Sequence, residues 1–187
     1  QQRQTQGQQR QFQQQRQQQP VGQPRAPRPV QGQQNQAPQM GRVYAVTHED
    51  ADASAEVVEG IILISEVEAK AIFDPGSTHS FVSHDFARHI HETVVRLDVA
   101  LVVGTPVGKQ VRCHQYFPST RVQVGDFILP ADLILLTMKD FDVILGMDWL
   151  ATYRAVMDCF NKTIKLSLHS DTIEFVGRRR PIQTCRI

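Results

Sequence analysis

One acidic residue, Asp74, stands where an apolar run meets a tight polar turn. The run Ala71-Ile72-Phe73 precedes it, and Pro75-Gly76 and the hydroxyl residues Ser77 and Thr78 follow it. Hydroxyls and backbone N–H groups are the donors that hold a carboxylate in a fixed orientation. Glycine lets such a turn close sharply and lets another backbone approach. The pattern indicates a carboxylate placed for acid–base chemistry, although Asp-Pro-Gly is also an ordinary turn sequence and that alternative stays open at this point.

A second stretch, residues 141–150, is an apolar run that ends in glycine and passes into a short helical turn. Its centre is Ile144-Leu145-Gly146. Asp142 and Asp148 flank this turn, and we expect them to cap or solvate it rather than to take part in catalysis. Between the two stretches lies a glycine-containing hairpin loop around residues 104–108, which connects two predicted strands.

The order of acid loop, glycine hairpin and apolar strand with terminal glycine resembles the retroviral and retrotransposon aspartic protease family. The amino-acid sequences around Asp74 and Asp142 are most similar to those of proteases from plant Ty3/gypsy-type elements. The resemblance extends over residues 42–176. In that family the acid loop usually reads Asp-Thr-Gly or Asp-Ser-Gly, so Pro75 departs from the pattern. This departure favours a second hypothesis, a catalytically silent or domesticated module of the same fold that serves dimerisation or partner binding.

The resemblance implies a retropepsin-like aspartic endopeptidase that processes a Gag-Pol polyprotein, with Asp74 as the catalytic residue and no cofactor. Such chemistry needs two carboxylates about 3 Å apart that share one proton. Asp74 begins the only Asp-x-Gly in the chain, so a working site requires a homodimer. The resemblance also implies a flap that closes over the peptide, hinged at its two glycines; it consists of Val103, Gly104, Thr105, Pro106, Val107 and Gly108.

The elements that must position these residues are short strands. Runs rich in Val, Ile and Leu alternate with turn residues, and only residues 81–90 and 146–150 have a helical pattern. We therefore expect an all-β fold, a retropepsin-like closed barrel or sandwich with one or two short helices. The expected strands are residues 57–67, 69–73, 97–103, 110–117, 120–124, 127–129, 133–136, 143–145, 155–158, 163–168 and 172–176.

The chain divides into a tail, a folded domain and a terminal linker. Residues 1–41 are rich in Gln, Arg and Pro and contain no acid, so they cannot bury enough apolar surface to fold and are predicted to be disordered. Residues 42–176 form the protease-like domain, and residues 177–187 lead toward a following domain. The arginines of the tail predict at most a weak contact with RNA.

Several classes of protein do not fit this composition. The three cysteines form no C-x-x-C pair, and the spacing of His79, His84, His89 and His91 is not that of a metal site, so no metal is expected. No apolar run is long enough to cross a membrane, and the N-terminal residues lack the apolar core of a signal peptide. We expect a soluble protein that is located in the cytoplasm, including the virus-like particles that its polyprotein would form there.

Overall fold

The computed structural model describes residues 39–43, 47, 57–106, 108–168 and 171–178. The predicted tail up to residue 38, Val107 and residues 179–187 lie outside these ranges. The described part is an all-β fold with very little helix, as predicted. Its elements are β1 (Gln39–Arg42), β2 (Val58–Ile64), β3 (Val67–Phe73), β4 (Phe81–Ser83), the 3-10 helix η1 (Phe86–His89), β5 (Val95–Gly104), β6 (Gln110–Thr120), β7 (Val122–Val124), β8 (Phe127–Ile128), β9 (Ala131–Leu136), β10 (Val143–Leu145), α2 (Met147–Thr152), β11 (Val156–Asp158), β12 (Thr163–Ser167) and β13 (Thr172–Val176).

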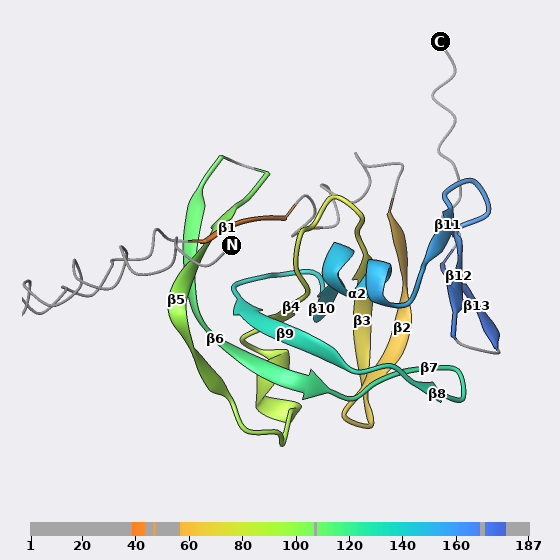
Figure 1. The fold of residues 1–187 in the computed structure, drawn as a ribbon, viewed down its shortest axis with the longest axis horizontal. Helices are drawn as coiled ribbons and strands as arrows, with labels where there is room; N and C mark the ends of the chain where they lie inside the picture. Colours follow the sequence, from red (N-terminus) through yellow and green to blue (C-terminus); the bar gives the residue numbers. More distant parts are fainter. Residues whose placement is uncertain (1–38, 44–46, 48–56, 107, 169–170, 179–187) are drawn as a thin grey trace, which may run out of the picture. The chain divides into compact units, whose positions relative to one another are not determined.

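Among the described residues, the first ten strands form one sheet in the order β1-β5-β6-β9-β4-β10-β3-β2-β7-β8. Hairpins connect β2 with β3, β5 with β6 and β7 with β8 (Figure 1). Gly125 lies in the turn that joins β7 to β8 and has a φ of 59°, a conformation that glycine adopts without strain. No helix in the described part of the chain is long and apolar enough to span a membrane.

The placement of β10 decides how the acid loop runs. β10 pairs with β3 in parallel, Leu145 opposite Phe73, and with β4 in antiparallel register, Ile144 opposite Phe81. The chain therefore leaves the sheet at the end of β3 and must cross the end of β10 before it returns as β4. The residues that make this crossing are 74–80, which include the whole predicted acid loop.

Two apolar clusters hold the sheet in place. One contains Phe73, Leu145 and Trp149 and packs β3 and β10 against α2. The other contains Ile72 and Ile144, which lie on the same strands with their side chains on the opposite face. Because successive side chains of a strand point to opposite faces, a fully buried pair of strands contributes to both clusters. Asp74 thus follows a strand that is fixed on both sides.

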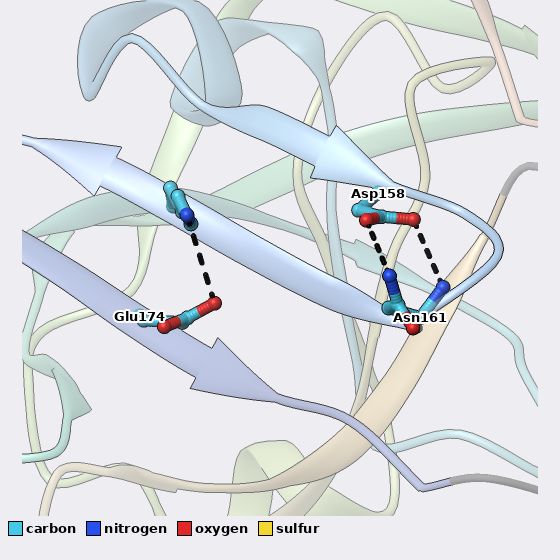
Figure 2. A network of polar contacts seen from close by, with 4 residues as sticks. Asp158, Asn161 and Glu174 are labelled. Atoms are coloured by element: carbon cyan, nitrogen blue, oxygen red, sulfur yellow. Dashed lines mark hydrogen bonds and ion pairs between the residues drawn. The ribbon is translucent and has the colours of Figure 1, made fainter.

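A separate three-stranded antiparallel sheet follows α2, with the order β11-β12-β13. Its inner face buries Ile164 and Leu166. On its outer face the Asp158 carboxylate accepts hydrogen bonds from the Asn161 backbone N–H (2.9 Å) and side-chain amide (2.8 Å), and Glu174 forms an ion pair with a lysine of β12 (Figure 2). The two bonds from Asn161 lower the pKa of the Asp158 carboxyl and close the β11–β12 turn.

Three local predictions were wrong. Residues 81–90, predicted as one helix, form β4 and η1 instead, because Phe81 and Val82 are both buried between β9 and β10. The predicted strand 57–67 breaks at Ser65 and Glu66, which adopt positive φ angles in the β2–β3 turn. Residues 39–41, assigned to the disordered tail, belong to β1, which is stabilised by pairing with β5 rather than by any apolar pattern of its own.

Candidate active site

Asp74 is the centre of the candidate site, and its side chain is only 1% exposed. Its backbone N–H donates to the Leu145 carbonyl (3.0 Å), which extends the β3–β10 ladder by one residue. Its Oδ1 accepts the Gly76 N–H (2.8 Å) and its Oδ2 accepts the Ser77 hydroxyl (2.6 Å). One donor on each oxygen fixes the plane of the carboxylate. The predicted loop residues Gly76 and Ser77 are therefore brought to Asp74.

Gly146 lies directly under the crossing loop. A Cβ built on it would be 2.2 Å from the His79 carbonyl oxygen and 2.9 Å from the Ser77 carbonyl oxygen, which are both backbone atoms. The Met147 N–H donates to that same Ser77 carbonyl (2.8 Å). The loop can lie this close to the end of β10 only because residue 146 has no side chain. The predicted glycine of the second stretch is thus required by the acid loop itself.

Ser80 and Asp148 tie the far end of the loop to α2. The Asp148 carboxylate accepts the Ser80 N–H (2.9 Å) at Oδ2 and the Ser80 hydroxyl (2.7 Å) at Oδ1, and the Ser80 Oγ accepts the Gly146 N–H (3.1 Å). Ser80 is fully buried, so these bonds satisfy polar groups that water does not reach. Asp148 was expected to cap or solvate its turn; its carboxylate also anchors the loop that carries Asp74.

Asp142 has a comparable structural role on the other side of the site. Its Oδ2 accepts the Lys70 N–H (2.8 Å), and its backbone bonds both Lys70 and Ser83. These bonds direct Asp142 and Asp148 toward structural partners, and neither was predicted to be catalytic. The pairing of Ser80 with Asp148 could not be read from the sequence, because the two residues are 68 positions apart and only the placement of β10 brings them together.

Pro75 lies on the outer side of the loop and is partly exposed. With Met147, Leu150 and Ala151 it lines a mainly apolar pocket of about 440 Å³ beside α2. Proline has neither a backbone N–H nor a hydroxyl, so at this position the loop offers no donor to a neighbouring molecule. Thr78, the last predicted loop residue, instead faces β1: its N–H donates to the Arg42 carbonyl (3.0 Å) and its Oγ1 accepts the Arg42 N–H (2.9 Å).

The predicted flap corresponds to the end of the β5–β6 hairpin. Val103 and Gly104 are still in β5, paired with Val111 and Gln110. The tip is a tight turn in which the Thr105 N–H donates to the Lys109 carbonyl (2.9 Å) and the Gly108 N–H to the Thr105 carbonyl (2.9 Å).

The two glycines of this hairpin differ. Gly108 has a φ of 74° and is required by the turn, whereas a Cβ on Gly104 would meet nothing within 4 Å. Closure over a peptide and the hinge at Gly104 stay predictions. Pro106 is exposed at the tip, and Val107 lies outside the described residues.

The arrangement supports acid–base chemistry at a single, rigid and buried carboxylate. One carboxylate can accept or deliver one proton, whereas peptide hydrolysis by a carboxylate pair needs a second group at about 3 Å. Among the described residues, no group of three or more His, Cys, Asp or Glu side chains is placed so that it could bind a metal ion. Within the described residues, the site of one chain therefore offers one buried carboxylate, that of Asp74.

Comparison with known proteins places this geometry in context. Residues 38–172 match the family model described as "Retroviral aspartyl protease". The UBA domain-containing protein Mud1 of Schizosaccharomyces pombe (strain 972 / ATCC 24843) is 28% identical over 113 residues, which cover 59% of this chain and 32% of that protein. This chain thus spans about a third of the length of that curated relative.

Two solved structures are also similar. The retroviral protease-like domain of Ddi1 from Leishmania major has a TM-score of 0.45 and 19% identity, with 62% of this chain and 90% of that chain covered. The EIAV protease, solved with an inhibitor, has a TM-score of 0.44 and 17% identity, with 54% of this chain and 90% of that chain covered.

Proposed function

The chain belongs to the retroviral aspartyl protease family, and from this premise we propose that it is an aspartic endopeptidase that is active as a homodimer. Each subunit contributes Asp74. The observation that carries the proposal is the buried carboxylate with one donor on each oxygen, in a loop that the sequence contains only once. A twofold axis between two such loops supplies the carboxylate pair that one chain lacks.

In the proposed reaction the two Asp74 carboxylates share one proton. The ionised member takes a proton from water as the water attacks the scissile carbonyl, and the protonated member donates a hydrogen bond to the carbonyl oxygen. The C–N bond of the tetrahedral intermediate then breaks, the proton taken from water passes to the leaving amine nitrogen, and the carboxylate pair again holds one proton. The Gly76 N–H and the Ser77 hydroxyl hold each carboxylate in plane. The peptide lies beneath the β5–β6 hairpin, which closes over it.

The natural substrate that we propose is the Gag-Pol polyprotein of a Ty3/gypsy-type retrotransposon, with the cytoplasm or virus-like particles as the place of action. Two features of the sequence support this substrate: the residues around Asp74 and Asp142, and the arginine-containing, Gln-rich residues 1–38. Those residues are also proposed to make a weak contact with RNA. Incubation of the purified protein with its natural precursor polypeptide tests the proposal, and pepstatin-sensitive cleavage is the expected result.

One observation favours a second candidate, a module of the same fold without peptidase activity. Pro75 presents no hydroxyl and no backbone N–H where the family loop has Thr or Ser. In this alternative the chain dimerises or binds a partner, and the precursor stays intact at every enzyme concentration.

Dilution is expected to inactivate the enzyme. Because a monomer has only half of the site, the activity per mole of chain must fall once the concentration drops below the dimer dissociation constant. Well below that constant, a tenfold dilution should reduce the activity per mole about tenfold. Initial rates across a dilution series measure this, with sedimentation of the same samples as the control. An active species that sediments as a monomer contradicts the dimer.

Replacement of Pro75 by Thr is expected to strengthen the dimer. The hydroxyl can hydrogen-bond the partner loop, and two symmetric bonds of about 1 kcal/mol each tighten dimerisation by roughly 2 kcal/mol, or about thirtyfold. Loss of the proline ring loosens the unfolded chain, which lowers the folding stability of each subunit by about 0.4–1 kcal/mol and leaves the association of folded subunits unaffected. Dissociation constants of the parent and Pro75→Thr dimers provide the measurement.

The matched control is Pro75→Val, which has the shape of threonine and restores the N–H but carries no hydroxyl. If Pro75→Thr and Pro75→Val dimerise equally, the hydroxyl makes no contact across the axis. If, in addition, neither variant dimerises more tightly than the parent, Pro75 no longer supports the inactive alternative.

A further inference from the structure

The segment Gln39–Val43 is hydrogen-bonded on both sides. On one side β1 pairs in parallel with β5, from Gln39 opposite Leu101 to Arg42 opposite Gly104, and the Val43 N–H donates to the Gly104 carbonyl (3.1 Å). On the other side the Arg42 N–H and carbonyl bond the Oγ1 and N–H of Thr78 (2.9 and 3.0 Å). Figure 1 shows β1 beside the β5–β6 hairpin. An extended backbone thus lies between the predicted flap and the acid loop.

The side chains of this segment alternate between inside and outside. Val43 is 2% exposed and belongs to the cluster that contains Ile72 and Ile144, residues of the strands that position the acid loop. Gly41 is also buried, and a Cβ on it would be 3.2 Å from the Leu101 side chain. Met40, in contrast, is 65% exposed. The segment is therefore held by its backbone and by one buried branched side chain, and it has one position, Gly41, where a side chain would press on Leu101.

The contacts of Gln39–Val43 are those of a peptide that a protein binds by adding it to a sheet as a strand. In that mode of binding, main-chain hydrogen bonds give affinity and alternate side chains give selectivity. β1 has the features of such an added strand. It is the terminal strand of the sheet order, and it is distant in sequence from its partner β5.

We propose that Leu101–Gly104 and Thr78 form a peptide-binding site, the β5–Thr78 site, that the chain's own Gln39–Val43 segment occupies. The ligands of this site are extended peptides with the pattern Gly-x-Val, in which a branched aliphatic residue takes the place of Val43 and glycine takes the place of Gly41. The segment competes with such peptides. That the competing peptides are substrates rests on the proposed peptidase function, whereas binding itself does not.

A binding experiment in the full-length chain tests this. The probe is a fluorescein-labelled, end-blocked peptide Gln-Met-Gly-Arg-Val, and the readout is its fluorescence anisotropy. Val43→Asp places a charge in an apolar cluster and should expel the segment, because an unpaired buried charge is strongly disfavoured. This variant is expected to bind the peptide, and the parent chain is expected to bind it at least about tenfold more weakly, since its own tethered segment competes.

The matched control is Met40→Asp, which introduces the same charge in the same segment at an exposed side chain and should behave like the parent. A peptide with Asp in place of Val should not bind, and one with Val in place of Gly should bind more weakly. If the protein is an active peptidase, Val43→Asp should also lower the KM for an external Gly-x-Val peptide.

A second variant covers the case in which Val43→Asp does not fold. Arg42→Pro removes the N–H that bonds Thr78 but leaves the apolar cluster intact, and it should also take up the peptide. If both variants unfold, β1 is an integral strand and the proposal is wrong. Folded variants that do not bind the peptide overturn it equally. If the chain binds the peptide but has no peptidase activity, the β5–Thr78 site is supported and the proposed peptidase function is rejected. A failure of the binding site can therefore be distinguished from a failure of the proposed function.

Discussion

Replacement of Asp74 by Asn should abolish peptide-bond cleavage and leave the fold intact. Asparagine has almost the shape of aspartate but cannot accept a proton from the attacking water, and a positioned acid or base contributes about 10²–10⁴-fold to such reactions. In a dimer both carboxylates are lost at once, so the rate should fall by at least that factor. Initial rates with a peptide substrate and the melting temperature, recorded on the same preparation, measure the two parts of the prediction.

The fold is expected to survive because the side-chain hydrogen bonds of Asp74 with Gly76 and Ser77 can be replaced. An asparagine Oδ1 still accepts the Gly76 N–H, and its amide can donate to the Ser77 hydroxyl, which rotates to accept. The matched control is Asp126→Asn, which removes the same charge from an exposed turn and should keep full activity. Undiminished cleavage by folded Asp74→Asn would falsify the assignment of Asp74 as the catalytic residue.

Replacement of Gly146 by Ala is expected to have the largest effect on stability. The new Cβ would meet the His79 carbonyl oxygen at 2.2 Å, and this oxygen is part of the backbone and cannot rotate away. The loop must move, although Met147 and Asp148 hold it by short hydrogen bonds. Such overpacking costs about 1–3 kcal/mol and sometimes more. Activity should fall further than stability, because a shift of about 1 Å at a catalytic group can cost about 10²-fold.

Gly104→Ala is the matched control, because its new Cβ would meet nothing within 4 Å. Its free energy of unfolding should change by no more than about 0.5 kcal/mol. Denaturant unfolding measures the free energy of unfolding of both variants. Equal values for Gly146→Ala and Gly104→Ala would show that the acid loop is not in close contact with residue 146. Loss of activity in Gly104→Ala at unchanged stability would support the predicted hinge of the flap.

The two experiments together separate the two functional hypotheses. If the parent chain cleaves its precursor and Asp74→Asn does not, the buried carboxylate is catalytic. If neither cleaves while Gly146→Ala still unfolds more easily, the loop has a structural role and the chain is a protease-like module without activity. The Pro75→Thr variant then shows whether the missing hydroxyl accounts for that inactivity.

The sequence by itself determined the class of fold and the composition of the acid loop. Short runs rich in Val, Ile and Leu between turn residues predict strands because burial acts on each side chain locally, and Asp74, Gly76 and Ser77 are neighbours along the chain. For the same reason their mutual hydrogen bonds could be expected before the structure was known. The short helix after Gly146 was predicted on equally local grounds.

Only the tertiary structure decided which distant residues meet. Phe81 and Val82 are compatible with a helix and become a strand because β9 and β10 bury both of their faces. Ser80 meets Asp148, and Gly146 meets the loop above it, because β10 is inserted between β3 and β4. Residues 39–43 have no strand pattern and are ordered by pairing with β5 and Thr78. Local preference amounts to a few tenths of a kcal/mol per residue, so burial and pairing across the chain override it.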